Sequence, residues 1–137
     1  PLTAMATAFA RIAVPDDLAP TRADAINRLG NAIAANPLMV AGSGRLCSEV
    51  IEHSGRRTLV KTGADGVYTA ALQEQGLGVA LKIDDGSGPA AQVAILSVLR
   101  HLGGLHADEL EQLDDRCRVP ISNTRGIITG YRQAAML

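Results

Sequence analysis

Three short apolar runs with brief connectors constrain the fold of this chain more than any other feature. The sequence predicts strands at residues 58–61, 67–72 and 77–83, joined by turn-rich segments at 63–66 and 74–76. Parallel neighbours would need a crossover of a dozen or more residues, which these connectors cannot supply. The pattern therefore predicts an antiparallel three-stranded sheet.

Helices are predicted before the strands. Apolar residues recur at helical spacing over residues 2–12 and 26–33. Thr21 and Asp24 are typical of a capping box at the start of the second helix. Ser43 is expected to cap a third, short helix.

A broad apolar helix is predicted after the strands, over residues 90–102. A helix of this composition must be largely covered, so we expect it to lie across one face of the sheet. A last short helix at 106–113 and an isolated strand at 127–129 complete the pattern. The fold class predicted is α+β, an antiparallel sheet flanked by helices.

Composition excludes several classes of function. The chain is 47% hydrophobic, as a packed globule requires. Its net charge is −1, so it lacks the excess of basic residues that would indicate a nucleic-acid partner. No apolar run of ~18 residues indicates a membrane span. Cys47 and Cys117 are isolated cysteines, which favours a reducing, cytoplasmic location.

The strongest candidate for a catalytic segment is Lys61-Thr62-Gly63, at the end of the first predicted strand. Lys-Thr-Gly on a strand is one signature of serine acyl-enzymes. Lysine can lose its proton when it is partly buried and can then activate a serine, whereas arginine stays charged. A structural lysine at a strand end is the competing interpretation.

Four segments, in this order and spacing, resemble the L-asparaginase II family, which is related in fold to serine β-lactamases and glutaminases. They are residues 36–42 (NPLMVAG), 61–68 (KTGADGVY), 77–86 (LGVALKIDDG) and 123–126 (NTRG) with Gly130. The resemblance implies hydrolysis of L-asparagine to L-aspartate and ammonia by a serine nucleophile that works with lysine. Within it, Lys61 matches one of the paired lysines, and Thr62 and Gly63 are expected at the substrate.

The chain departs from the family pattern in one respect that matters for mechanism. It contains no Ser-x-x-Lys, since Ser54 is followed three places later by Arg57. We therefore expect residues 1–137 to be either a single domain or the C-terminal segment of a larger asparaginase-like domain, inactive alone. The family's zinc site is then expected upstream, with no metal or cofactor in this segment. An exposed apolar face would favour self-association or a homo-oligomer.

Two side-chain groups have simpler interpretations. Lys82 stands beside Asp84 and Asp85, so an ordinary ion pair is expected there. Cys117 lies between Arg116 and Arg118, which could lower its pKa, but incidental placement between the two arginines is the favoured interpretation.

Three functional hypotheses remain open at this stage. The first is an asparaginase-type amidohydrolase that acts on small molecules. The second is a non-catalytic ligand-binding or regulatory domain on the same scaffold. The third is a nucleotide-binding module built on residues 86–91, a degenerate glycine fingerprint that lacks the expected second strand.

Overall fold

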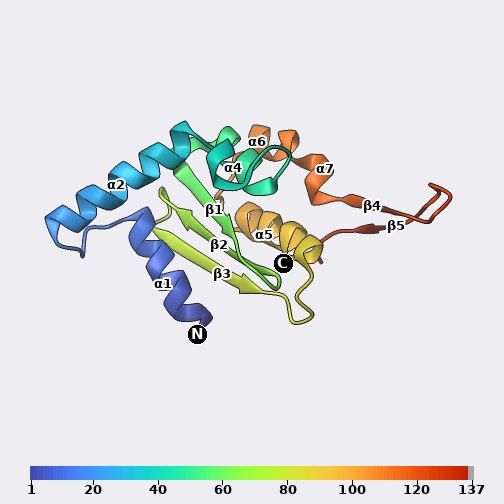
Figure 1. Cartoon of the computed structure of the whole chain (residues 1–137), viewed down its shortest axis with the longest axis horizontal. Coiled ribbons are helices and arrows are strands. Elements are labelled where there is room, and N and C mark those ends of the chain that lie inside the picture. The colour runs from blue at the N-terminus through green and yellow to red at the C-terminus, as the bar shows by residue number, and fades with distance from the viewer. Residues whose placement is uncertain (136–137) are drawn as a thin grey trace.

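The computed structural model describes residues 1–135, which form one α+β unit (Figure 1). The helices and strands follow one another in the order α1 (Leu2–Ala13), α2 (Pro20–Ala35), α3 (Leu38–Ala41), α4 (Leu46–Ser54), a 3-10 turn (Gly55–Arg57), β1 (Thr58–Thr62), β2 (Val67–Leu72), β3 (Leu77–Lys82), α5 (Gly88–His101), α6 (Ala107–Gln112), α7 (Asp114–Cys117), β4 (Val119–Ser122) and β5 (Ile128–Arg132). Within the described residues, no helix combines the length and apolar character that crossing a bilayer requires.

The predicted meander is confirmed. The sheet has the order β1-β2-β3, and both neighbouring pairs are antiparallel. Lys61 lies opposite Thr69, which in turn lies opposite Ala80. Directly paired residues share a face of the sheet, so this register fixes which side chains point towards each layer of helices.

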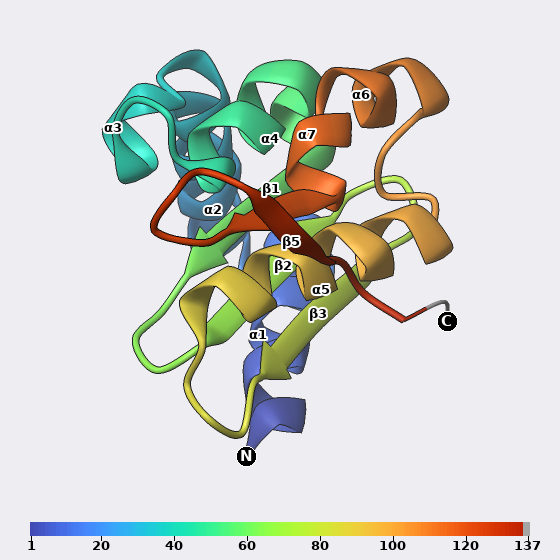
Figure 2. The same ribbon diagram turned by 90° about the vertical axis from the view of Figure 1, so that its right-hand side faces the viewer.

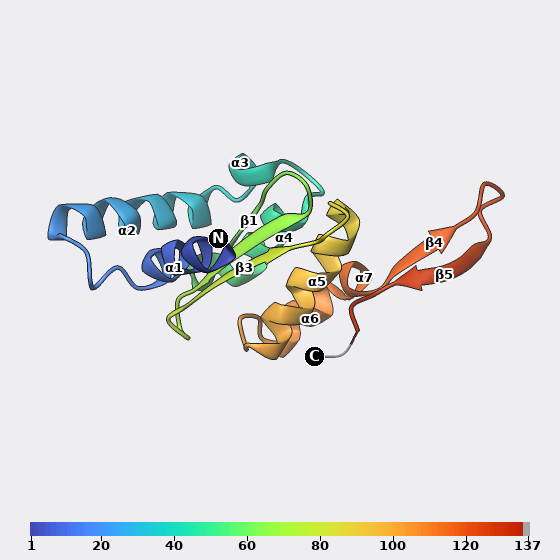
Figure 3. The ribbon, with the colours of Figure 1, turned by 90° about the horizontal axis from the view of Figure 1, so that it is seen from below.

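One face of the sheet forms the core against α4 and α5 (Figure 3). Thr58 Oγ1 donates to the carbonyl of Gly104, just beyond α5, and Tyr68 Oη lies 3.1 Å from Cys47 Sγ of α4. Burial, and then the contact with Cys47, raises the pKa of the Tyr68 phenol. Helix α5 begins where Ser87 Oγ accepts from the backbone N–H of Ala90, which confirms the covering helix predicted here.

The opposite face is covered by α1, which crosses β3 at Gly78. A Cβ placed on Gly78 would lie 1.9 Å from the carbonyl oxygen of Ala6, so only glycine permits this approach. Arg56 then joins the two N-terminal helices. Its Nη2 donates to the Ile12 carbonyl at 3.1 Å, while its guanidinium fills the space beside Gly30 of α2.

Three details of the predicted helices and strands were wrong. Helix α2 begins at Pro20, whose fixed φ suits a first turn, so Thr21 lies inside the helix and no capping box forms. Ser43 caps nothing, because α4 begins at Leu46. The strand predicted as isolated at 127–129 is β5, which pairs with β4. The short helix α3 was not predicted, because a single turn leaves no periodicity in the sequence.

We predict that Gly78→Ala destabilises the protein by about 3 kcal/mol, the upper part of the usual range for overpacking, because the backbone of α1 has to move away. Gly88→Ala is the matched control, since a Cβ there meets no atom within 4 Å and its free energy of unfolding should change by less than about 0.5 kcal/mol. Urea denaturation of the two variants measures the difference. Equal midpoints would show that α1 does not pack on β3.

Candidate active site around Lys61

Lys61 stands near the end of the edge strand β1, on the same sheet face as α1. Its side chain is exposed, and Nζ donates to the Thr62 carbonyl at 2.9 Å. Thr69 Oγ1 on the central strand donates to the Lys61 carbonyl at 3.0 Å and so fixes the backbone beneath the lysine. An ammonium group has three N–H donors, so two remain for a substrate or a catalytic partner.

The turn after Lys61 is tight. Gly63 N donates to the Val67 carbonyl at 2.8 Å, and a Cβ on Gly63 would come within 3.2 Å of Val67. The chain reverses through Asp65 and Gly66, both at positive φ, where glycine carries no steric penalty. Thr62 lies opposite Tyr68, so its hydroxyl points to the sheet face away from Lys61, and neither Thr62 nor Gly63 lines the hollows beside the lysine.

A second turn packs against the first. The N–H of Ile83 donates to the Gly66 carbonyl at 3.1 Å, and a Cβ on Gly86 would lie 3.5 Å from Asp65. The segments 61–68 and 77–86 are thus held together at one end of the sheet.

Of the two aspartates in this second turn, Asp85 has a structural role. Asp85 Oδ1 accepts from Ser87 N at 2.9 Å, immediately before α5. The expected ion pair of Lys82 is not formed in the described part of the chain. Instead, Lys82 Nζ donates to the Ile83 carbonyl, because the side chain folds back along its own backbone.

Two adjoining hollows open beside Lys61. The deeper one, of about 180 Å³, is lined by Phe9, Ile12, Ile26, Leu29, Gly30, Ile33, Val40, Leu59, Val60 and Lys61. The more open one, of about 490 Å³, is lined by Ala32, Ile33, Asn36, Met39, Val40 and Lys61. Among residues 1–135, the lysine is the one charged group in either lining. An apolar hollow with a single ammonium at its mouth is suited to a small ligand with an anionic end.

Two of the four segments that carry the family resemblance line these hollows, and a third, 77–86, packs against the turn that follows Lys61. Residues 36–42 supply Asn36, Met39 and Val40 to the wall opposite Lys61. The fourth segment, 123–126, lies at the far tip of the β4–β5 hairpin, away from the lysine (Figure 3). The sequence did not indicate that Ile33 and Asn36 lie beside Lys61, because only the packing of α2 brings them beside β1.

Comparison with known proteins decides the family. A family model described as L-asparaginase II matches residues 1–134. The chain belongs to the L-asparaginase II family. At the level of the family this assigns it to the asparaginase-type amidohydrolases, whose substrate is a small molecule. No curated protein matches the chain.

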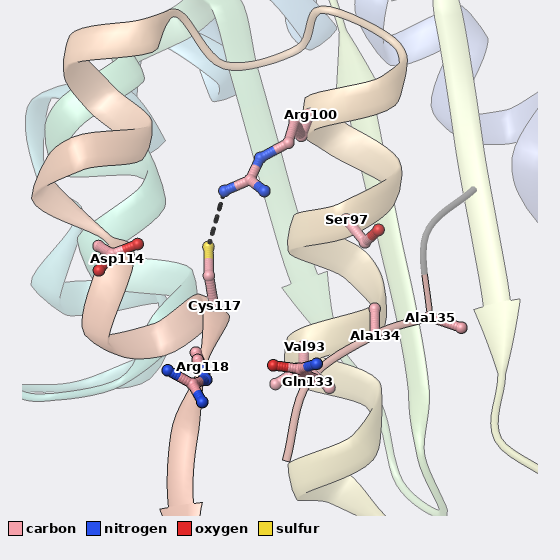
Figure 4. A pocket seen from close by; sticks show the side chains of 9 residues that line it. All are labelled: Val93, Ser97, Arg100, Asp114, Cys117, Arg118, Gln133, Ala134 and Ala135. Carbon is pink, nitrogen blue, oxygen red and sulfur yellow. Dashed lines mark hydrogen bonds between the residues drawn. The ribbon is translucent and has the colours of Figure 1, made fainter. Parts of the chain in front are cut away.

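A separate hollow of about 300 Å³ lies between α5, α7 and residues 133–135 (Figure 4). Arg100 Nη2 approaches Cys117 Sγ at 3.7 Å there. Burial nevertheless raises the pKa of the Cys117 thiol, and Arg100 offsets this only in part. Arg116 donates to Glu49 and Arg118 stacks on Tyr131, so the placement of Cys117 between two arginines is incidental, as the sequence favoured.

Metal binding has no support among residues 1–135, where no three histidine, cysteine or acidic side chains gather closely enough to hold an ion. The zinc site implied by the family resemblance is therefore not assigned to Cys47 or Cys117.

We predict that Cys117 reacts with iodoacetamide more slowly than a free thiol at pH 8, because its raised pKa leaves less thiolate. Arg100→Met should slow the reaction further by removing the one positive charge that lowers this pKa. Cys47, 1% exposed, should react only on unfolding and provides the internal reference. The alkylation rates of Cys117 in the wild-type protein and in Arg100→Met are measured at several pH values by mass spectrometry of the alkylated peptides. A Cys117 as fast as a free thiol would contradict the effect of burial.

Proposed function

We propose that this chain contributes the Lys-Thr-Gly lysine to the active site of an L-asparaginase, which hydrolyses L-asparagine to L-aspartate and ammonia. The observation that carries this proposal is that Lys61 and residues 36–42 line one open hollow, while segment 77–86 packs against the turn that follows Lys61. Membership of the L-asparaginase II family supports it.

The chemistry assigned to Lys61 is that of a lysine paired with a serine. A serine hydroxyl is a poor nucleophile until a neighbouring base takes its proton. In its neutral form Lys61 would take that proton, and as an ammonium it would stabilise the alkoxide and the oxyanion that follows. Two N–H donors of Nζ remain uncommitted after the bond to the Thr62 carbonyl.

Thr62 and Gly63 are proposed to bind the substrate. Only their place in the Lys-Thr-Gly segment motivates this part of the proposal, because strand alternation directs the Thr62 hydroxyl to the sheet face opposite Lys61. A free amino acid is polar, and the open hollow has polar groups at one end, on Asn36 and Lys61. This end therefore suits such a ligand better, in size and polarity, than the deeper apolar hollow does.

The nucleophile must come from elsewhere. Among the described residues, no serine lines either hollow beside Lys61. We therefore propose that a segment outside residues 1–137 supplies it, and we predict that residues 1–137 expressed alone release no ammonia from L-asparagine. A coupled ammonia assay tests this. Turnover by these residues alone would place the nucleophile within the chain.

In the full-length protein, Lys61→Met and Lys61→Arg should each lower kcat for L-asparagine at least ~100-fold, the low end for loss of a general base. Methionine removes both the charge and the base, whereas arginine keeps the charge and cannot give up its proton. Lys82→Met is the matched control, since Lys82 is the other lysine, lies on the same sheet face and sits on the opposite edge strand. Near wild-type kcat in Lys61→Met would end the catalytic assignment.

A non-catalytic ligand-binding domain is the second candidate, favoured by the lack of a serine in the described walls of the hollows. Calorimetry distinguishes the two functions. Full-length wild-type protein that binds L-asparagine without turnover, and loses binding in Lys61→Met, would identify the binding domain.

A further inference from the structure

The hollow between α5, α7 and residues 133–135, which we call the α5–α7 hollow, lies on the other side of the sheet from Lys61. Figure 2 shows α5 in front of the sheet and α1, which covers the face that carries Lys61, behind it. Within residues 1–135, its lining shares no residue with the two hollows beside Lys61. Its volume of about 300 Å³ is at the lower end of the range for small-molecule sites. The α5–α7 hollow is therefore a separate candidate site for a small ligand.

Three charged side chains of both signs line this hollow. Arg100 comes from α5, Asp114 from the start of α7, and Arg118 from the position that follows α7. All three residues are exposed, and among residues 1–135 none of them takes part in an ion pair. Opposite charges that line one hollow without pairing stand too far apart to meet directly. A ligand that fits between them can therefore pair with each.

Cys117 marks the point that these charges surround. Burial raises the pKa of its thiol, the charge of Arg100 lowers it, and the charge of Asp114 raises it, so both charged groups act on the same sulfur. Arg100 Nη2 lies 3.7 Å from this sulfur. Figure 4 shows Arg100 above Cys117 and Arg118 below it. A ligand held between the two guanidinium groups would therefore lie against the thiol.

The two guanidinium groups are positioned by the fold and keep N–H donors for a ligand. The Arg118 guanidinium stacks 3.7 Å from the centroid of the Tyr131 ring. This contact uses the flat face of the guanidinium and leaves the N–H groups in its plane available. Ser97, three residues before Arg100 on α5, and Gln133 add a hydroxyl and an amide to the lining. Groups that are already positioned lose less conformational entropy when a ligand binds.

The charges of the lining select an amino acid with two carboxylates. Each arginine is suited to bind one carboxylate through two parallel N–H donors, and the carboxylate of Asp114 is suited to an ammonium group. L-aspartate carries two carboxylates and one ammonium, which is the same set of charges with the signs reversed. L-asparagine has an uncharged amide in place of the second carboxylate and would leave one arginine unpaired. The lining therefore favours the product of the proposed reaction over its substrate.

We propose that the α5–α7 hollow is a second small-molecule site, which binds L-aspartate away from the place where Lys61 acts. Arg100 and Arg118 hold the two carboxylates, and Asp114 holds the ammonium group. The choice of L-aspartate rests on the proposed function, whereas the charge pattern that selects a dicarboxylic amino acid does not. Because the sheet separates the two places, L-aspartate bound here leaves the space beside Lys61 open to substrate.

Alkylation of Cys117 in the full-length protein tests the site, because a ligand between Arg100 and Arg118 covers the thiol. Saturating L-aspartate should slow the reaction of Cys117 with iodoacetamide. L-2-aminobutyrate, which has a methyl group in place of the second carboxylate, should bind at least ~10-fold more weakly, the low end for loss of a hydrogen bond between charged groups. An alkylation rate unchanged by L-aspartate, or equal protection by both ligands at one concentration, would overturn the inference. Protection by inorganic phosphate and not by L-aspartate would identify a phosphate site and equally refute it.

Variants assign the charges, and the readout is the ratio of alkylation rates with and without ligand, which cancels any change in the thiol itself. Arg100→Gln and Arg118→Gln should each weaken L-aspartate binding at least ~10-fold. Arg125→Gln is the matched control, since Arg125 lies in the turn between β4 and β5, outside the hollow. Asp114→Asn should weaken the binding of L-aspartate but not that of succinate, which has two carboxylates and no ammonium. Wild-type affinity in either arginine variant, or equal effects of Asp114→Asn on both ligands, would contradict the proposed site.

Lys61→Met in the full-length protein separates this inference from the proposed function. Lys61 lies outside the α5–α7 hollow, so L-aspartate should protect Cys117 in this variant as it does in the wild-type protein. Ammonia release from L-asparagine by the same variant tests the proposed function alone. Loss of protection in Lys61→Met would show that the L-aspartate that protects Cys117 binds beside Lys61, and would refute a second site.

Discussion

Burial of the central strand β2 on both faces is the constraint on which the remaining structure depends. Ala70, Ala71 and Leu72 have no exposed surface, and a strand in this position requires a layer of helices on each side. The two layers meet the sheet differently. On one face, α4 and α5 fill the core with large side chains. On the other face, the backbone of α1 approaches β3 so closely that only a glycine, Gly78, fits beneath it.

This unequal packing also shapes the candidate site. Helix α1 covers β2 and β3 but leaves the end of β1 open, and the hollows beside Lys61 lie where α2 and α3 pass over that uncovered strand. The lysine is therefore held on a rigid strand, supported from behind by Thr69, while its ammonium faces a space that a ligand can enter. Rigid support with open access is what a positioned catalytic or binding lysine needs.

The net charge of the chain is near zero, and charged groups in its interior are few. Buried Glu109 accepts from Arg57 and from the N–H of His106. Arg56, half-buried, donates from Nη2 to the Ile12 carbonyl, while its buried Nη1 has no hydrogen-bond partner among the described residues.

The sequence by itself determined the three-strand meander, the covering helix and the family, because short connectors, an apolar period and the spacing of Lys-Thr-Gly are local properties of the chain. Tertiary structure alone decided three other features. Lys61 meets Asn36 only because α2 packs over β1, and Cys117 has a raised pKa only because α5 buries it. Gly78 meets the backbone of α1 only because α1 crosses β3 at that residue. Each of these depends on distances between distant segments, which no local pattern records.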